Sequence, residues 1–161
     1  MPQIIEENLI TSKSQIVELY SKGAKQKTDF KVGIEAEKLP VNSQNLKAVS
    51  YFGENGVLEF LKRYKENYGW KYIIADGKII GLINETGTIT VEPGSQLEYS
   101  INPQKTIAET AFLLKRFNNS VNEIGKEFNI TWFEYGIQPF STFKEIDVIP
   151  TGVGDHFRDN G

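Results

Sequence analysis

A succession of short apolar segments separated by tight turns, from residue 70 to residue 99, most constrains the fold of this chain. Residues 70–75 end at Asp76 and Gly77, a pair typical of two-residue hairpin turns, and residues 78–84 return in the opposite direction. A second turn at residues 85–87 leads into residues 88–99, so this region is predicted to form three or four short strands. Strands joined by such short turns pair antiparallel, so the sequence predicts a β-meander.

Helical periodicity lies on both sides of this meander. Apolar residues recur at helical spacing from Val57 to Tyr64. A longer stripe from Ile107 to Phe128 predicts a helix of about two dozen residues, which we expect Asn102 and Pro103 to open. Residues 12–23 predict a shorter helix that begins with a capping box.

Two further strands are expected at about residues 30–38 and at residues 130–137, and Pro40 is expected to limit how far the first one runs as a central strand. Trp70 and Trp132 are expected in the core. Residues 141–161 have no clear periodicity and are predicted to form an irregular tail. The sequence therefore predicts an α+β fold in a single domain over residues 1–161, which is long enough for a sizeable hydrophobic core.

Composition excludes several classes of function. The net charge is −3 with both signs mixed along the chain, which argues against a nucleic-acid partner. The chain has no cysteine, so disulfides and thiol chemistry are excluded. The first nine residues do not read as a signal peptide, and no apolar run approaches the length of a membrane span, so we expect a cytoplasmic protein without a membrane partner.

Two acidic segments are the best candidates for chemistry. In residues 31–38 (KVGIEAEK), an extended backbone places Glu35 and Glu37 on one face. Residues 92–98 (EPGSQLE) place Gln96 and Glu98 together, whereas a bulge at residues 93–94 would either bring Glu92 to the same side or turn it away. Mg²⁺ prefers such hard oxygen ligands. If the two segments form two sides of one site, their carboxylates are close together. With a divalent cation bound, the carboxylates are its ligands; without one, they repel one another and their pKa values rise.

Other readings of these residues remain open. A single E-x-E segment is usually the solvated side of a half-buried sheet. Ser50 and Tyr51 would either touch a ligand or pack within their loop, and Lys38 would serve equally well as an ion-pair partner. The single histidine, His156, lies in the tail, so no histidine-based triad or zinc site is expected. No glycine-rich phosphate-binding motif is present, so a bound nucleotide would depend on a metal and side chains.

The acidic segments belong to an ordered set of motifs that resembles a known family. The set comprises GIEAEK at residues 33–38, VSY at 49–51 with Gly53 and Gly56, IIGL at 79–82, VEPGSQLEYS at 91–100 and IPTG at 149–152. In this order the motifs resemble glutamate–cysteine ligase of the plant and proteobacterial type, the first enzyme of glutathione synthesis. The resemblance covers roughly residues 31 to 152, and the E-P-G-x-Q-x-E-x-S block is its most specific part.

This resemblance implies a glutamine-synthetase-like fold, a curved, mainly antiparallel sheet that forms part of a funnel, with helices on one face. It implies that ATP phosphorylates the γ-carboxylate of glutamate and that the amine of cysteine attacks the acyl phosphate, with Mg²⁺ or Mn²⁺ as cofactor. Carried over residue by residue, Glu35, Glu37 and Glu98 match metal ligands, Glu92 matches less securely, and Gln96 and Tyr51 are expected to bind substrate. No residue is expected to act as a covalent nucleophile.

The chain also departs from the family. Members of the family are far longer than 161 residues, and this chain reads VGDHFRDNG after its IPTG motif, where they continue differently. Three readings therefore stand: the N-terminal part of a glutamate–cysteine ligase, a catalytically inactive remnant or binding module of the same fold, or an unrelated α+β domain. Half a funnel leaves an open sheet edge, so self-association or a partner chain is also expected.

Overall fold

The computed structural model describes residues 9–147, and the chain divides into two units, Met1–Phe30 and Lys31–Gly161. The first unit contains helix α1 (Lys13–Lys22), followed by a 3₁₀ turn at Lys27–Asp29. The Ser12 side chain accepts a hydrogen bond from the Gln15 backbone N–H and the Gln15 side chain reaches back to the Ser12 N–H, so the predicted capping box is confirmed. No residue of α1 is buried.

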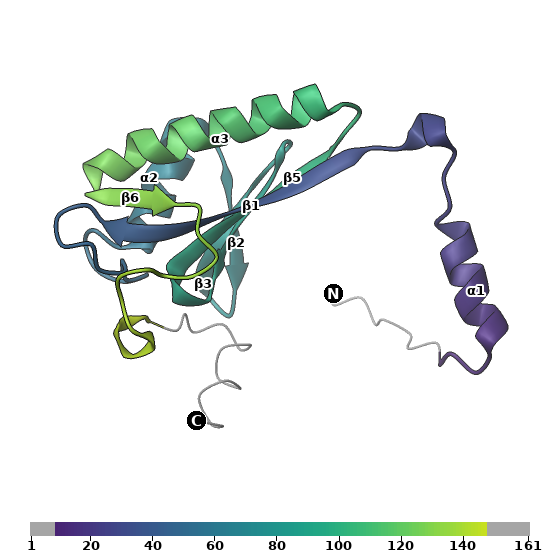
Figure 1. Cartoon of the computed structure of the whole chain (residues 1–161), viewed down its shortest axis with the longest axis horizontal. Helices are drawn as coiled ribbons and strands as arrows, with labels where there is room; N and C mark the ends of the chain where they lie inside the picture. The colour runs from purple at the N-terminus through teal and green to yellow at the C-terminus, as the bar shows by residue number, and fades with distance from the viewer. Residues whose placement is uncertain (1–8, 148–161) are drawn as a thin grey trace. The chain divides into compact units, whose positions relative to one another are not determined.

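The second unit is built on a six-stranded sheet with strand order β2-β3-β4-β5-β1-β6, in which every described pair of neighbours is antiparallel (Figure 1). The predicted α+β class and the meander are confirmed. The strands are β1 (Val32–Asn42), β2 (Lys71–Ala75), β3 (Lys78–Asn84), β4 (Gly87–Glu92), β5 (Gln96–Gln104) and β6 (Ile130–Phe133).

Of the three or four strands predicted for the meander, four form, because residues 88–99 contribute to two strands of a hairpin. A 3₁₀ turn at Pro93–Ser95 separates β4 from β5, and Glu92 lies directly opposite Gln96. Gly94 adopts φ 80°, a left-handed conformation that glycine reaches without steric cost. Residues 93–94 therefore reverse the chain rather than form a bulge within a continuous strand.

Strand β1 continues to Asn42, beyond its predicted end near residue 38, but Pro40 does limit how far it runs as a central strand, as expected. Residues 32–38 pair with β5, whereas residues 39–42 pair with β6 on the other edge, where Pro40 lies opposite Trp132. From residue 39 onward β1 has a strand partner on one edge only, and a proline in such a strand need not interrupt a hydrogen-bond ladder. Strand β6 is also shorter than predicted and ends at Phe133.

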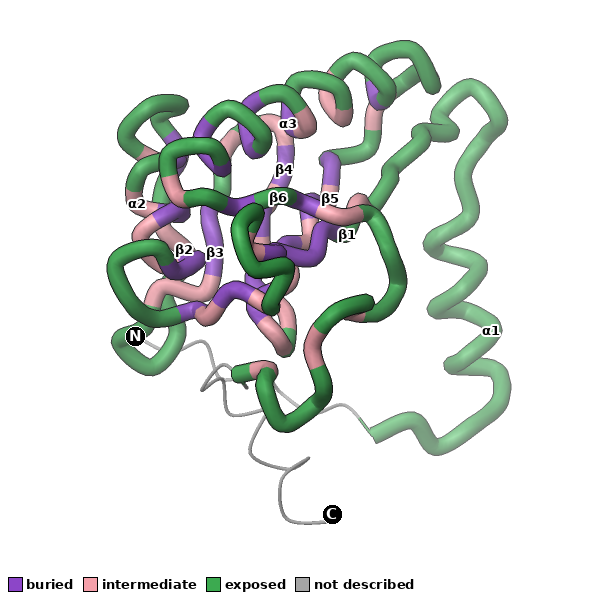
Figure 2. Tube along the Cα trace, turned by 60° about the vertical axis from the view of Figure 1, so that its left-hand side comes forward, coloured by how far each residue is buried: buried purple, intermediate pink, exposed green. Residues whose placement is uncertain are grey.

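Helices α2 (Val57–Tyr68) and α3 (Ile107–Glu127) cover one face of the sheet, and the core lies between them and the strands (Figure 2). The core contains Phe60 and Leu61 from α2, Leu82, Leu97 and Tyr99 from the sheet, Val121 and Ile124 from α3, and both tryptophans.

Helix α3 begins later than predicted. Asn102 and Pro103 belong to β5, and the helix begins after Thr106, whose capping box with Glu109 fixes its start. The predicted apolar stripe is buried only in its second half, since Ile107 is 75% exposed. No described helix is both long enough and apolar enough to cross a membrane.

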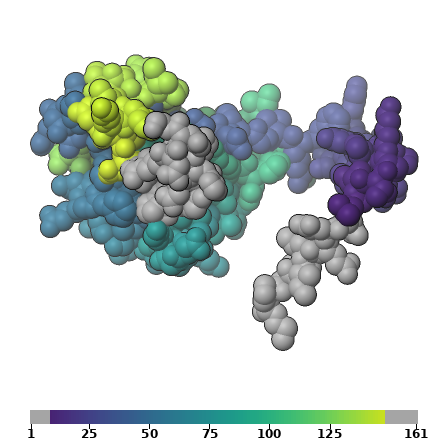
Figure 3. All heavy atoms as spheres, turned by 90° about the horizontal axis from the view of Figure 1, so that it is seen from below, coloured from purple at the N-terminus to yellow at the C-terminus, as the bar shows by residue number. Residues whose placement is uncertain are grey.

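The last described residues pack against the loop that follows β1 (Figure 3). Lys47 Nζ lies 2.8 Å from Glu145 Oε1, and Ser50 Oγ donates a hydrogen bond to Asp147. This packing is the structural role expected for Ser50. A short 3₁₀ turn at Phe143–Glu145 occupies the start of the predicted irregular tail. The IPTG motif at residues 149–152 and His156 lie outside the described residues.

Candidate acidic site

One face of the sheet gathers the four candidate glutamates. In the register of the sheet, Glu37 lies opposite Glu98, which in turn lies opposite Thr90 of β4. Glu35 lies opposite Ser100, and Glu92 lies opposite Gln96. Directly opposite residues of an antiparallel pair share a face, so these side chains project together from three adjacent strands. We call this set the acidic face: Glu35, Glu37, Glu92, Gln96 and Glu98.

The acidic face is the side of the sheet away from α2 and α3. Side chains alternate along each strand, and the residues between the glutamates, such as Val91, Leu97 and Tyr99, are buried in the core beneath the helices. The glutamates therefore face outward because their neighbours in the sequence are apolar. Glu35 and Glu37 are exposed, whereas Glu92, Gln96 and Glu98 are half-buried.

The clustering of negative charge on the acidic face affects the pKa of Glu92. Partial burial raises the pKa of the Glu92 carboxyl above its ordinary value, and the negative charges of Glu98 and Glu37 raise it further. A hydrogen bond from Thr90 opposes this shift. The expected rise in pKa without a cation is thus confirmed at Glu92. Glu98 accepts a hydrogen bond from Ser100 Oγ at 3.0 Å.

Neighbouring carboxylates do not by themselves make a ligand cage. Within residues 9–147, no group of three or more Asp, Glu or His side chains is placed so that it could hold a metal ion. The assignment of Glu35, Glu37, Glu92 and Glu98 as metal ligands stays a prediction.

Tyr51, which was expected to bind substrate, lies in the hydrophobic core and not on the acidic face. Its side chain is 3% exposed and packs in the hydrophobic core, where its hydroxyl donates a hydrogen bond to the backbone carbonyl of Ile79. Burial raises the pKa of the Tyr51 hydroxyl. A side chain so enclosed has little surface left for a ligand, whereas Gln96 lies on the acidic face itself.

Lys38 is an ion-pair partner, but on the opposite side of the sheet. Its side chain is 3% exposed, its Nζ lies 2.5 Å from Glu134 Oε1, and the same amine lies 5.9 Å from the centre of the Phe117 ring. Because it alternates with Glu37 along β1, it points toward α3. The ion-pair reading of Lys38 is confirmed.

A groove that the sequence did not reveal runs beside the unpaired edge of β1. Strand β6 ends at Phe133, so the edge of residues 32–37 that faces away from β5 has no strand partner among the described residues. A cavity of about 480 Å³ lies along this edge, and its lining includes residues 35–37, Leu114, Asn118 and Glu134. Asn118 Oδ1 is buried there without a hydrogen-bond partner among the described residues. The polar Asn118 beside the apolar stripe of α3 is the only sequence signal for this groove.

The comparisons with known proteins agree with the motif set. The family model described as "Glutamate-cysteine ligase family 2 (GCS2)" matches residues 31–159, so the match begins where the second structural unit begins. The chain is 27% identical over 141 residues to glutamate–cysteine ligase A, chloroplastic, of Oryza sativa subsp. japonica, covering 88% of this chain and 28% of the rice protein.

Two other plant glutamate–cysteine ligases match this chain with similar identity and coverage. Glutamate–cysteine ligase, chloroplastic, of Arabidopsis thaliana is 26% identical over 147 residues, covering 91% of this chain and 28% of the relative. The protein of the same name from Solanum lycopersicum is 28% identical over 141 residues, covering 88% of this chain and 26% of the relative. The chain thus spans between about a quarter and 30% of the length of these relatives.

Proposed function

Because this chain belongs to glutamate–cysteine ligase family 2, we propose that its acidic face forms part of the active-site wall of a ligase that joins glutamate to cysteine with ATP. The observation that carries the proposal is the convergence of Glu37, Glu92 and Glu98 on one face, where partial burial and the charges of Glu98 and Glu37 raise the pKa of Glu92. Uncompensated negative charge of this kind favours a bound cation.

The chemistry of the donors fits Mg²⁺ or Mn²⁺. Carboxylate oxygens, with the amide of Gln96 and the hydroxyls of Thr90 and Ser100 beside them, are hard ligands, and the chain has no cysteine to favour a softer metal. Glu35, Glu37, Glu92 and Glu98 are the residues that would hold the ion. When bound there, such an ion would supply positive charge to offset the negative charge of a nucleotide's phosphates.

In the proposed reaction, the γ-phosphoryl group of ATP passes to the γ-carboxylate of glutamate, and ADP leaves. The amine of cysteine then attacks the acyl carbon, phosphate leaves, and γ-glutamylcysteine is formed. The acidic face contributes electrostatic complementarity and positioning, and Gln96 offers an amide donor and acceptor to a substrate on the same wall. No side chain of this chain is required as a covalent nucleophile.

A second candidate function is a binding module without turnover. One observation favours it: the edge of β1 at residues 32–37 has no strand partner among the described residues. In this alternative the unpaired edge accepts a strand from the rest of a ligase or from another chain, and the acidic face is completed only in that assembly. The predicted cytoplasmic location stays a prediction, since the plant relatives are named as chloroplastic proteins.

Titration calorimetry with Mn²⁺ and with Mg²⁺–ATP tests the acidic face. We expect the wild type to take up Mn²⁺, and Glu37→Gln/Glu98→Gln to weaken that uptake by at least about tenfold, because two opposed carboxylates are removed. Glu54→Gln/Glu66→Gln is the matched control, since it removes the same charge from exposed positions outside the acidic face. Equal uptake by all three proteins would contradict the proposal.

An ADP-release assay with glutamate and cysteine separates the two functions. Turnover that Glu37→Gln/Glu98→Gln abolishes and the control double variant retains supports the ligase. Mn²⁺ uptake without ADP release, in a protein whose circular dichroism shows a folded chain, supports the binding module.

A further inference from the structure

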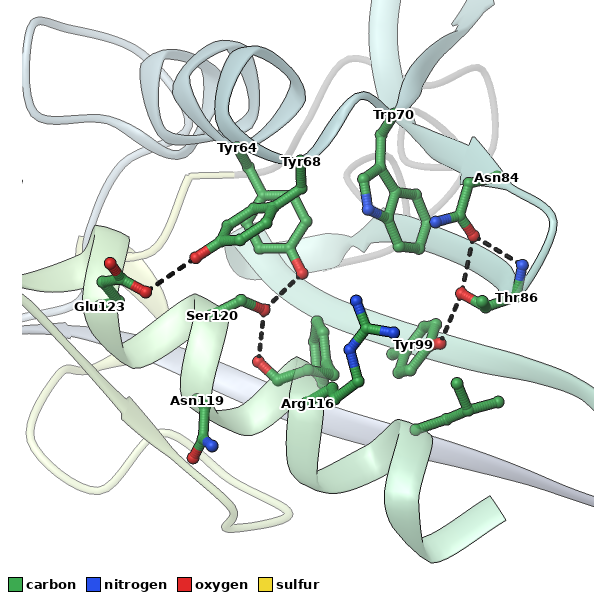
Figure 4. Close-up of a pocket in the computed structure, with 12 residues that line it drawn as sticks. Tyr64, Tyr68, Trp70, Asn84, Thr86, Tyr99, Arg116, Asn119, Ser120 and Glu123 are labelled. Atoms are coloured by element: carbon green, nitrogen blue, oxygen red, sulfur yellow. Dashed lines mark hydrogen bonds between the residues drawn. The ribbon is translucent and has the colours of Figure 1, made fainter. Parts of the chain in front are cut away.

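A second cavity lies on the helix side of the sheet, away from the acidic face. Its volume is about 310 Å³, at the lower end of the range of about 300–1,000 Å³ typical of small-molecule sites. Aromatic rings from α2, β5, α3 and the residue before β2 form much of its wall (Figure 4). We call it the aromatic cavity, after Tyr64, Tyr68, Trp70, Tyr99 and Phe117.

The tyrosine hydroxyls of the aromatic cavity are held by protein partners. Tyr64 and Ser120 share a hydrogen bond of 2.6 Å, Tyr68 donates to Glu123 at 2.9 Å, and Tyr99 pairs with Thr86 at 3.0 Å. Burial raises the pKa of all three hydroxyls, to about 12 for Tyr68. The rings are therefore neutral and fixed in place at physiological pH. Tyr68, which is 37% exposed, is the ring with substantial surface for a ligand, whereas Trp70 and Tyr99 are 7% and 2% exposed.

Arg116 is the one cationic group among the lining residues. In Figure 4 its guanidinium reaches from α3 into the space near Trp70 and Tyr99. Within the described part of the chain it forms no ion pair with a carboxylate, whereas Arg63 of α2 pairs with Glu127 at 3.4 Å. The contact that Arg116 does make is with the ring of Phe112, 5.9 Å from its guanidinium carbon. The aromatic cavity thus presents an unneutralised, planar, bidentate donor beside apolar rings.

We propose that the aromatic cavity binds a small planar molecule that carries a single carboxylate. Its ring would pack against the exposed part of Tyr68, and its carboxylate would pair with the guanidinium of Arg116. Glu123, at the rim, disfavours ligands of higher negative charge, such as phosphate monoesters, because one arginine cannot offset both. This site is separate from the acidic face and needs no metal.

Ligand-observed NMR with indole-3-carboxylate tests the site. We expect saturation transfer to the ring protons, and binding at least about tenfold weaker in Arg116→Gln, because one charge-assisted bidentate contact is lost. Lys115→Gln is the matched control, since it removes one positive charge from the adjacent exposed position of α3, outside the cavity lining. The uncharged indole-3-carboxamide should bind the wild type as weakly as the acid binds Arg116→Gln.

Absence of binding up to about 5 mM indole-3-carboxylate would overturn the proposal, as would equal binding by the wild type and Arg116→Gln. Arg116 is exposed, and circular dichroism verifies that its variant is folded. Glu37→Gln/Glu98→Gln should bind the ligand like the wild type. A failure of this inference is therefore distinguishable from a failure of the metal-binding proposal.

Discussion

At the scale of single residues, Glu92 is where the acidic face opposes folding most directly. The native state holds the Glu92 proton more tightly than the unfolded chain, because burial and the charges of Glu98 and Glu37 raise its pKa above the ordinary 4.5. Between the unfolded and folded pKa values the native state binds more protons, so its stability falls as pH rises through that interval. The contribution is fully present below the unfolded pKa and lost above the folded one.

Glu92→Gln should therefore stabilise the metal-free protein at pH 7, by up to about 1 kcal/mol, and leave its stability unchanged near pH 4, where the wild-type carboxyl is largely protonated. Urea unfolding in EDTA, followed by tryptophan fluorescence, measures this difference. Glu54→Gln, in the exposed loop before α2, should change stability at neither pH. If Glu92→Gln raised the free energy of unfolding by the same amount at both pH values, the charge of Glu92 would not be the cause.

Lys38 gives a second prediction at this scale. Its amine is buried against Glu134, whose own side chain is 66% exposed. Glu134→Ala leaves a buried ammonium without its carboxylate, which should destabilise the protein by about 1–3 kcal/mol. Lys38→Met keeps the volume and removes the charge, so its cost should be smaller, within about 1.5 kcal/mol. Chemical denaturation of both variants at pH 7 tests the order, and a greater loss in Lys38→Met would contradict it.

At the scale of the elements, β3 and β4 can pair as they do because of Gly81. A Cβ built at this position would lie 2.3 Å from the backbone carbonyl oxygen of Ile89, on the neighbouring strand, where no flexible side chain can yield. Gly81 faces Thr90 in the register, one strand away from Glu98. The spacing of the strands beneath the acidic face thus depends on a residue without a side chain.

Gly81→Ala should destabilise the protein by more than about 2 kcal/mol, because relieving the clash requires β3 and β4 to separate. Gly136→Ala is the matched control, since a Cβ there meets no atom within 4 Å and φ is not positive. Thermal unfolding of the two variants measures the contrast. If Gly81→Ala were as stable as Gly136→Ala, the close approach of the two strands would not be a constraint.

At the scale of the whole molecule, the unpaired edge of β1 determines which partner the sheet can accept. Exposed edges favour pairing with another strand. When two copies of this edge pair antiparallel around Ala36, Glu35 of each copy lies opposite Glu37 of the other, and each like-charge pair costs roughly 0.2–1 kcal/mol. The edge therefore disfavours a second copy of itself and suits a strand that carries basic residues at alternate positions.

Removing this repulsion should promote self-association. In analytical ultracentrifugation at pH 7 and low salt, the dimerisation constant of Glu35→Gln/Glu37→Gln should exceed that of the wild type by about twofold to thirtyfold. Added salt should narrow the difference, because it screens exposed charges. Glu54→Gln/Glu66→Gln controls for the change in net charge. Wild-type dimers that are as stable as those of the Glu35/Glu37 variant would refute the role of the edge charges.

The sequence by itself determined the local structure and the family. The hairpin at Asp76 and Gly77, the apolar faces of α2 and of the second half of α3, and the capping box at Ser12 depend on neighbours in the chain, so periodicity and turn chemistry predicted them. The same alternation of apolar and acidic residues placed Glu35 with Glu37 and Gln96 with Glu98.

Only the tertiary structure decided how these pieces meet. Whether Glu92 joins the acidic face depended on the turn at residues 93–95 being a hairpin, and the path of β1 through Pro40 depended on β6, some ninety residues later, pairing on one edge only. Within residues 9–147, the edge of β1 lacks a strand partner and Arg116 lacks a carboxylate partner, and both facts are properties of packing in three dimensions. Local sequence fixes which side chains share a strand face, whereas the register and order of the strands decide which of those faces become one surface.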